Sequence, residues 1–248
     1  EHQQTSKTYV TERRNMTKVV KLYDLSFAPN PKRLRLYCIE RDILKEFDLE
    51  DVLAKKGQKG LLSDEFVDKY PRGCVPAMEL EDGTIIGDGA VCMRYLEKVY
   101  TETPSLYGRN PKEAAIVDLW ESYAYEDGML SVVESFRNSK NSPISHAMPG
   151  IPSITKVPAL EKRGNARLQI FLDSFEKQIY AKTYICGEYF SAADITAFAA
   201  IEFASEVIPN FKIKGEHTKN WFQNMKKRPC VLKDAELLKL ESKIESLV

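Results

Sequence analysis

Two short stretches place polar residues at the expected start of a helix, where free backbone N–H groups can face a ligand. In GDGAVCMRYL (87–96), Asp88 and Gly89 follow directly on a predicted hairpin. Free N–H groups and the positive end of the helix dipole bind anions, and the Asp88 carboxylate accepts hydrogen bonds from an ammonium group. Together they suit a zwitterion, such as the α-amino acid end of a ligand. The alternative is that Asp88 only caps the helix.

The other stretch is FAPNPKRL (27–34), in which two prolines flank Asn30. Asn30 is a good N-cap and Pro31 suits the first helical position, so we expect a helix to begin there. A strand over 19–25 precedes this turn, because its β-rich residues partly alternate in polarity. For Asn30, a plain capping role is at least as good an interpretation as a role in chemistry.

A third feature is the Val75–Pro76 pair at the start of an expected strand over 75–80. A proline is tolerated at this position because its missing N–H costs least at the first residue of a strand. A cis Val75–Pro76 bond would turn the Val75 N–H and C=O outward, ready to pair with an extended peptide as an added strand. From spacing alone, an ordinary trans proline at a sheet edge is the favoured alternative.

The elements that must position these residues form a small α/β unit. We expect, in chain order, a strand at 19–25, a helix from Asn30, a strand at 46–52, a short helix capped by Ser63, a hairpin of 75–80 with 84–87, and a helix carrying Val91, Tyr95 and Val99. The Asp82-Gly83 pair inside the hairpin favours a type I′ turn. The order β-α-β-α-β-β-α within about 85 residues is typical of one domain.

Beyond the proline-bounded linker PSLYGRNP (104–111), the strand patterns stop and an all-helical unit begins. Helical periodicity covers four segments, 112–137, 158–181, 191–206 and 216–228. Ser191 and Asp194 have capping-box spacing, with Phe190 and Ile195 placed for a hydrophobic staple, so this motif is structural. We therefore expect a flexible tail at 1–16, an α/β domain at 17–103, the linker, and a helical domain at 112–248.

Composition excludes several partners. Lys plus Arg and Asp plus Glu balance at 36 each, so no global field favours nucleic acid or an anionic membrane. No apolar run approaches the roughly 20 residues that cross a bilayer, and residues 1–16 carry no signal-like apolar stretch. The five scattered cysteines include no CxxC pair, which favours reduced thiols in a cytoplasmic protein without a metal site.

These motifs together resemble the cytosolic glutathione transferases over about residues 19–230. The resemblance rests on Gly73, Val75 and Pro76, the DGT hairpin (82–84), Asp88 at a helix start, and FSAADITAF (190–198) in a helical bundle. APNPKRLRL followed by CIERDI is most similar to the fungal and bacterial branch often written APNPRRVRIFLAEKG. That branch lacks the usual catalytic tyrosine, serine or cysteine. The implied fold is a thioredoxin-like N-terminal domain plus an all-α C-terminal bundle.

The resemblance also implies how glutathione, as co-substrate, would be bound. Val75 would pair through its backbone with the cysteinyl unit, and Pro76 would be the family's cis-proline. Asp88 stands where the family usually has Glu, and Gly89 where it usually has Ser. The Gly89 N–H still reaches the γ-glutamyl carboxylate, so weakened binding is expected. Lys59 falls near the family's basic contact to the glycyl carboxylate.

A glutathione paired with Val75 would bring its thiol close to the turn 26–30 and the following helix N-terminus. The candidate thiol-activating groups are the Asn30 backbone N–H, its side-chain amide, the Ser26 hydroxyl, and a held water. Cys74 adjoins Val75 and is a candidate for a mixed disulfide with glutathione, although an inert packing cysteine is the stronger interpretation.

The resemblance places an apolar acceptor pocket on the first helices of the bundle, with Tyr123 and Phe136 among its candidates. The branch's FRHTHP stretch corresponds to FRNSKNS (136–142), so its histidine position becomes Asn138. The implied protein is a homodimer that conjugates glutathione to small apolar electrophiles. Glutathione-dependent disulfide or peroxide reduction is a second possibility, and a non-catalytic scaffold or ligand carrier is a third.

Overall fold

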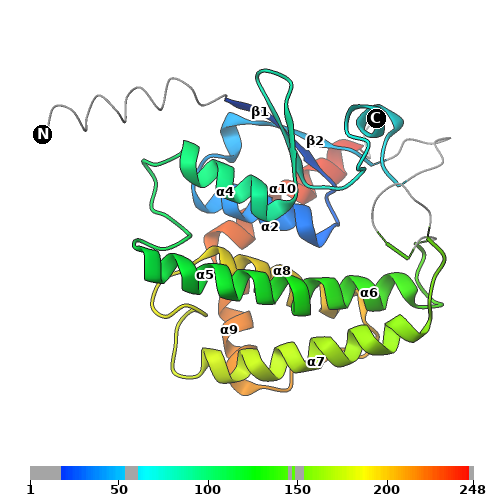
Figure 1. The fold of residues 1–248 in the computed structure, drawn as a ribbon, viewed down its shortest axis with the longest axis vertical. Coiled ribbons are helices and arrows are strands. Elements are labelled where there is room, and N and C mark those ends of the chain that lie inside the picture. Colours follow the sequence, from blue (N-terminus) through cyan, green and yellow to red (C-terminus); the bar gives the residue numbers. More distant parts are fainter. Residues whose placement is uncertain (1–17, 54–60, 145–146, 149–153, 246–248) are drawn as a thin grey trace, which may run out of the picture.

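An α/β layer lies against a bundle of long helices in the computed structural model, which describes residues 18–53, 61–144, 147–148 and 154–245 (Figure 1). The first half contains β1 (Val19–Asp24), α2 (Pro29–Glu40), β2 (Asp48–Asp51), α3 (Asp64–Lys69), β3 (Ala77–Leu80), β4 (Ile85–Gly87) and α4 (Gly89–Val99). The second half contains α5 (Pro111–Tyr123), the π-helical turn η2 (Ala124–Met129), α6 (Leu130–Asn138), α7 (Ala159–Ile179), α8 (Ala192–Val207), α9 (Glu216–Lys226) and α10 (Pro229–Glu245). The expected thioredoxin-like domain and helical domain are both confirmed. The predicted tail at 1–16 lies outside the described residues.

The four-stranded sheet has the order β2-β1-β3-β4, with β1 and β2 parallel and the other pairs antiparallel. Successive side chains of a strand point to opposite faces, so the sheet has two distinct apolar surfaces. Leu22 and its partner Met78 belong to the main core, which also contains residues of α2 and α4. Tyr23 and its partner Ala77 pack with Phe66 of α3 on the other face.

Two details of the sheet differ from the sequence prediction. Strand β2 is shorter than the predicted 46–52, because Leu44–Glu46 forms a 3-10 turn before it. In the β3–β4 hairpin, Gly83 has a φ of 83° and Asp82 has no positive φ. A type I′ turn requires a positive φ at both central residues, so the expected turn type is wrong. The Gly83 N–H instead donates to the Leu80 carbonyl at 2.9 Å.

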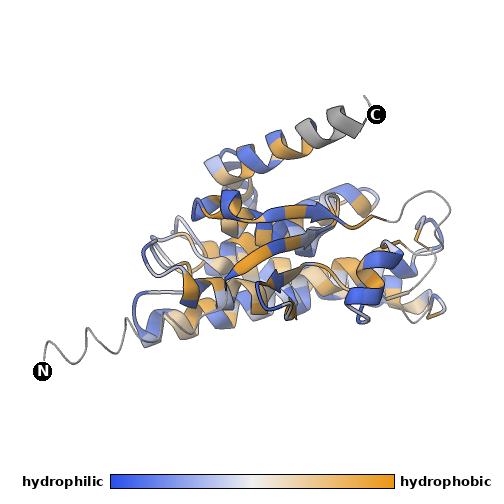
Figure 2. Ribbon diagram, turned by 90° about the horizontal axis from the view of Figure 1, so that it is seen from above, coloured by the Kyte–Doolittle hydropathy of each residue, from blue (hydrophilic) through white to orange (hydrophobic). Residues whose placement is uncertain are grey.

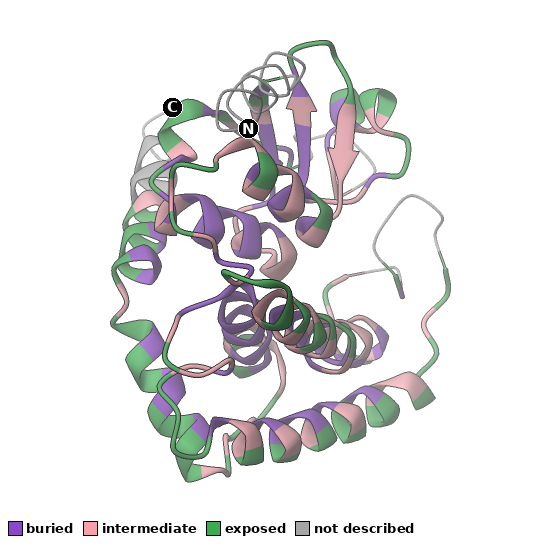
Figure 3. Cartoon of the chain, turned by 60° about the vertical axis from the view of Figure 1, so that its left-hand side comes forward, coloured by how far each residue is buried: buried purple, intermediate pink, exposed green. Residues whose placement is uncertain are grey.

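The predicted helices of the bundle are present with boundaries close to those expected. Helices α5 and α6 continue into each other through η2 and run beside α7 (Figure 1). Figure 3 shows α7 with buried residues toward the bundle and exposed residues on its outer side. Helix α8 is buried along most of its length and contacts both α2 and α5, so it forms the centre of the molecule.

The capping box at the start of α8 is confirmed. The Ser191 N–H donates to Asp194 Oδ2 at 3.1 Å, and the Ser191 side chain accepts from the helix backbone. Asp194 also accepts from the Ile185 N–H at 2.9 Å and from Trp221 Nε1 at 3.2 Å. One carboxylate therefore fastens the loop before α8 and helix α9 to the same point.

Asp194 should make stability depend on pH. Burial is the largest cause that raises its pKa to about 6, against the opposing hydrogen bonds. A carboxyl group with a raised folded-state pKa contributes stability that is complete below its unfolded pKa of about 3.9 and lost as pH rises through about 6. Asp194→Asn removes this titration. As the pH rises from about 4 to 6, the parent should therefore lose stability relative to the variant. The difference in their unfolding free energies, measured by urea denaturation, should shrink over this range. A constant difference would contradict this.

Helix α10 follows the last predicted helical segment, 216–228, and was not predicted. It begins at Pro229, and proline suits the first turn of a helix. The helix returns to the α/β layer and packs on α2 (Figure 1). There Arg35 Nε donates to Asp234 Oδ1 at 2.7 Å, and both side chains are about 1% exposed. A buried ion pair thus joins the last helix to the first.

Hydrophobic residues lie along the strands and inner helix faces, while hydrophilic residues occupy much of the outer helical surface (Figure 2). The main core runs without interruption from the sheet through α2 and α4 into α8 and the bundle. Within the described ranges, no helix combines the length and apolarity needed to span a membrane.

Candidate active site

Helix α2 presents one unpaired backbone N–H at its start. Ala28 is the N-cap and Pro29 the first helical residue, so the prediction of Asn30 as N-cap is wrong by two positions. The physical reason is that Pro29, like Pro31, has the φ of a first-turn residue. The first four N–H groups of a helix lack helical partners. Two of these positions are prolines and the Ala28 N–H closes the preceding turn, so in the described chain only the Asn30 N–H remains available.

The Asn30 side chain bridges α2 to the start of β3. Its Nδ2 donates to the Val75 carbonyl at 3.3 Å. Its Oδ1 accepts from Arg33 Nη1 at 2.6 Å. Both ends of the carboxamide are therefore occupied inside the protein, which leaves the backbone N–H and the second Nδ2 hydrogen of Asn30 to face a ligand.

The Val75–Pro76 peptide bond is cis, as the family resemblance implied, and not trans, as spacing alone favoured. Val75 is half-buried and comes just before β3, and Pro76 is buried. The Pro76 carbonyl accepts from the Asp88 N–H at 3.2 Å, which ties this turn to the start of α4. Among the described residues, the Val75 N–H has no hydrogen-bond partner. This backbone edge is therefore open to an added peptide strand.

Asp88 and Gly89 form the start of α4 beside this edge. Asp88 is the N-cap, and its Oδ1 accepts from the Ala90 N–H at 3.0 Å, so the capping interpretation is confirmed. Its φ of 78° combines with a ψ of 132°, a strained backbone conformation outside the left-handed helical region. A Cβ at Gly89 would lie 3.0 Å from Asn30 Oδ1. The absence of a side chain at 89 therefore leaves room for the Asn30 carboxamide.

Ser26 lies in the turn between β1 and α2, and its backbone is fixed from two sides. The Ser26 N–H donates to Asp51 Oδ2 at 3.0 Å, and its carbonyl accepts from Arg35 Nη2 at 3.2 Å. Its hydroxyl forms no hydrogen bond within the described chain. Lys59, the predicted contact for a glycyl carboxylate, lies outside the described residues.

The three residues predicted for an acceptor pocket all have partners within the bundle. The Tyr123 hydroxyl lies 3.1 Å from Ser174 Oγ, and the Phe136 ring packs edge-on against Phe203. Asn138 is buried, donates to the Glu134 carbonyl at 2.9 Å and accepts from the Val157 N–H at 2.8 Å. Tyr123 and Phe136 remain half-buried. Whether these residues meet an acceptor stays a prediction.

The pKa values of two bundle residues, Tyr125 and Arg137, respond to charges beside the Val75 edge. Burial is the largest cause that raises the pKa of the Tyr125 hydroxyl; the Asp88 charge raises it further and Arg33 opposes it. The phenol is therefore protonated at neutral pH and available as a donor. Burial lowers the pKa of Arg137, and the Cys74 thiol opposes this. Side chains of η2 and α6 thus lie within electrostatic range of the residues beside Val75.

Sequence reasoning missed Arg33 and Glu121, which form a buried ion pair behind the site. Arg33 Nη2 donates to Glu121 Oε1 at 2.7 Å, with side chains 0% and 6% exposed. Charged residues of a helix are usually exposed to solvent, so the sequence Lys32-Arg33 predicts two surface residues. The one usable signal was the spacing of three between Asn30 and Arg33, which places both on one helix face.

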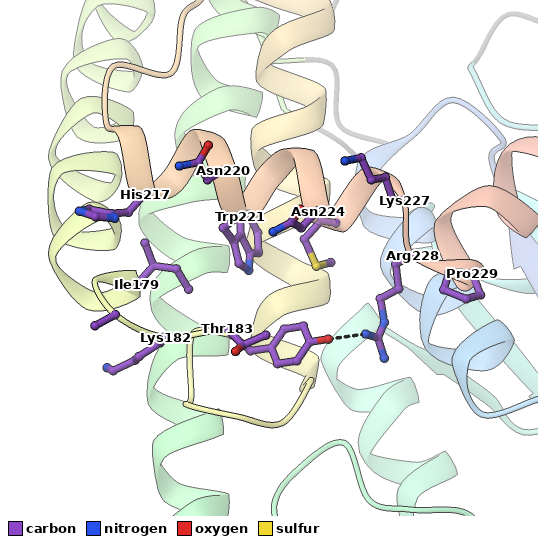
Figure 4. Close-up of a pocket in the computed structure, with 13 residues that line it drawn as sticks. Ile179, Lys182, Thr183, His217, Asn220, Trp221, Asn224, Lys227, Arg228 and Pro229 are labelled. Carbon is purple, nitrogen blue, oxygen red and sulfur yellow. Dashed lines mark hydrogen bonds between the residues drawn. The ribbon is translucent and has the colours of Figure 1, made fainter.

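A separate cavity of about 590 Å³ lies between the end of α7, the following loop and α9 (Figure 4). Lys182, His217, Asn224 and Arg228 are among its lining residues. Arg228 and Tyr184 both line it, and Arg228 Nη1 donates to the Tyr184 hydroxyl at 2.8 Å. None of the predicted site residues that the structure describes lines this cavity. Across the described ranges, no group of His, Cys, Asp and Glu side chains could hold a metal ion.

A thioredoxin-like domain with a cis-proline edge, followed by an all-helical domain, defines the class of the glutathione S-transferases. The family model for the glutathione S-transferase N-terminal domain matches residues 27–99, and that for the C-terminal domain matches residues 146–229. The chain therefore belongs to the cytosolic glutathione S-transferase family. It is a glutathione transferase.

Individual relatives agree with this assignment. The chain is 29% identical over 227 residues to glutathione S-transferase 2 of Saccharomyces cerevisiae, covering 90% of this chain and 91% of that protein. It is 26% identical to glutathione S-transferase GstA of Escherichia coli O157:H7, over 84% of this chain and 94% of that one. The solved structure of Gtt2 from Saccharomyces cerevisiae superposes with a TM-score of 0.73 at 26% identity, covering 87% of this chain and 100% of that one.

Proposed function

We propose that this transferase binds glutathione along the Val75 edge and conjugates its thiolate to small apolar electrophiles. The contact between Asn30 Nδ2 and the Val75 carbonyl, at 3.3 Å, carries the proposal. This contact puts the N-terminus of α2 beside the open backbone edge. A cysteinyl unit paired with Val75 would bring its thiol next to the free Asn30 N–H.

The start of α2 is sufficient to activate a thiol. A thiol with a pKa of about 8.5 is only a few per cent ionised at neutral pH, and the thiolate is the nucleophile. Lowering that pKa by about two units requires about 2.7 kcal/mol of preferential stabilisation of the thiolate. A helix N-terminus supplies about 0.3–2 kcal/mol, and one hydrogen bond to a charged sulfur about 1.5–3 kcal/mol. The Asn30 N–H is therefore the proposed donor, with the Ser26 hydroxyl as the second candidate.

This mode of activation agrees with the branch that lacks a catalytic tyrosine, serine or cysteine. The N-cap of α2 is Ala28, which offers no side-chain donor. The proton leaves the thiol for solvent as the thiolate forms, and the sulfur then attacks the electrophilic carbon. The acceptor would lie on the bundle side, where Tyr123, Phe136 and Asn138 remain the proposed lining.

The γ-glutamyl end would lie at the start of α4. The Gly89 N–H is at the first helical position and suits the carboxylate, while Asp88 Oδ2 is left over from capping and suits the ammonium group. Lys59 is the proposed partner of the glycyl carboxylate. Residues 17–103 would then form the glutathione-binding domain, joined through 104–111 to the helical domain at 112–248.

We further propose a cytoplasmic homodimer, as the family resemblance implies. Val91 on α4 and Leu119 on α5 support a dimer, because they are 51% and 64% exposed in a single chain. Light scattering at micromolar concentration should give twice the mass of one chain. A single-chain mass would count against the dimer.

Thermal unfolding with added ligand tests the proposed binding. Glutathione and S-hexyl glutathione should both raise the melting temperature, since a ligand at 100 times its Kd stabilises the native state by about 2.7 kcal/mol. The S-hexyl derivative should bind more tightly if an apolar acceptor site adjoins the thiol. Conjugation of an aryl halide then separates a transferase from a reductase, which would instead reduce a mixed disulfide or hydroperoxide. Binding without either activity would indicate a carrier.

Asn30→Ala distinguishes the backbone donor from the side-chain donor. The variant keeps the N–H and loses the carboxamide, so the pKa of bound glutathione should stay within about half a unit of the parent value. The thiolate absorbance of the complex, followed against pH, gives this pKa. A rise of about one unit or more would assign the thiol contact to the side chain.

A further inference from the structure

Arg33 lies at the centre of a buried polar cluster that joins the two domains. Its fully buried guanidinium donates from Nη2 to Glu121 Oε1 of α5 at 2.7 Å, and from Nε to Thr196 Oγ1 of α8 at 3.0 Å. The Tyr107 hydroxyl donates to the other Glu121 oxygen at 3.2 Å. Helices α5 and α8 therefore hold one side chain of α2 directly, and Tyr107 of the linker holds Glu121.

The remaining face of the guanidinium fixes the orientation of Asn30. Arg33 Nη1 lies 2.6 Å from Asn30 Oδ1. A guanidinium has donors and no acceptor, so the oxygen of the carboxamide must face Arg33 and its NH₂ group must face away. That NH₂ group points at the Val75 carbonyl, 3.3 Å distant. If the carboxamide were flipped, its NH₂ group would face the Arg33 donor and its oxygen would face the Val75 carbonyl oxygen. Neither hydrogen bond could then form.

We infer that Arg33 is a positioning residue of the glutathione site. Held by Glu121 and Thr196, it orients Asn30 so that the carboxamide anchors the Val75 carbonyl. A carbonyl oxygen has two lone pairs, so one remains for the N–H of a bound cysteinyl unit. The helical domain thereby sets glutathione affinity through α2. The inference rests on the proposed function.

The same helix supplies a matched control for a purely structural role. Arg35 is also buried in α2, and its partners are Asp24 of β1, Asp234 of α10 and the backbone carbonyl of Ser26. It does not contact Asn30. Glu121→Gln and Asp234→Asn therefore make the same chemical change, a buried carboxylate to an amide, next to two buried arginines of one helix.

The two variants should differ in glutathione binding, whereas both should lose stability for the same reason. Both should lower the melting temperature, because each weakens a buried ion pair. Glu121→Gln should raise the Kd and the KM for glutathione about five- to tenfold, the range expected for one weakened hydrogen bond. Its kcat at saturation should stay within about twofold of the parent value. The lost interaction stabilises bound glutathione equally in the ground state and the transition state. Asp234→Asn should leave Kd and KM within about twofold of the parent.

The outcomes separate the role of Arg33 from the proposed function. A parent protein that binds no glutathione in the thermal titration would overturn the proposed function and this inference with it. A parent that binds, with Glu121→Gln and Asp234→Asn equal in Kd, would overturn only the positioning role. If Glu121→Gln does not fold, Thr196→Val is the second variant. It removes the hydroxyl that accepts from Arg33 Nε and keeps the ion pair with Glu121. It should raise the Kd in the same direction, and an unchanged Kd would overturn the inference.

Discussion

Asp88→Asn should fold as stably as the parent and bind glutathione at least about tenfold more weakly. Asparagine is as good an N-cap as aspartate and accepts the same Ala90 N–H bond. Asparagine is also isosteric with aspartate, so the backbone strain at φ 78° and ψ 132° is the same in both proteins. The substitution therefore removes only the charge. An unpaired γ-glutamyl ammonium in a partly desolvated site would cost about 2–5 kcal/mol of binding.

Asp88→Ala is the matched control for the cap. Alanine cannot accept the Ala90 N–H bond, at a cost of about 1 kcal/mol. This variant should therefore lose both stability and affinity. Calorimetric titration with glutathione, beside thermal unfolding without ligand, measures both quantities. If Asp88→Asn binds glutathione as tightly as the parent, Asp88 is only a cap, and the proposed site loses its best-placed polar residue.

Arg33→Met should lower the free energy of unfolding by about 3–5 kcal/mol. The substitution leaves Glu121 buried between the domains with the Tyr107 hydroxyl as its remaining partner. An uncompensated buried charge is the main cost, more than the loss of the attraction itself. Urea denaturation followed by circular dichroism measures the change.

A double variant separates these two causes. Arg33→Met with Glu121→Leu removes both charges, so it should be clearly more stable than Arg33→Met alone. Arg109→Ala breaks an exposed pair with Glu113 and should leave the unfolding free energy unchanged within error. Equal destabilisation of the single and double variants would show that lost packing at residue 33 dominates instead of the unpaired carboxylate.

Sequence patterns predicted a helix start well where a few neighbouring residues are enough to define it. The capping box of Ser191 and Asp194 is present because its spacing alone satisfies the helix start. The start of α2 was misplaced by two residues, because two prolines and an asparagine allow more than one register of the first turn. The capping role of Asp88 was foreseen as an alternative, since an aspartate before a helical stripe carries that signal by itself.

Patterns in the sequence were enough to predict two domains and the family resemblance, and to single out Val75, Asp88 and Asn30. The role of each side chain depends on contacts between residues far apart in the chain, which form only when it folds. Arg33 and Glu121 are 88 positions apart and meet in the core, and Asn30 meets Val75 across 45 positions. Helix α10 returns to α2 in the same way, through Arg35 and Asp234. Charged residues carry no periodic signal for burial, since a buried charge is tolerated only where its partner folds against it.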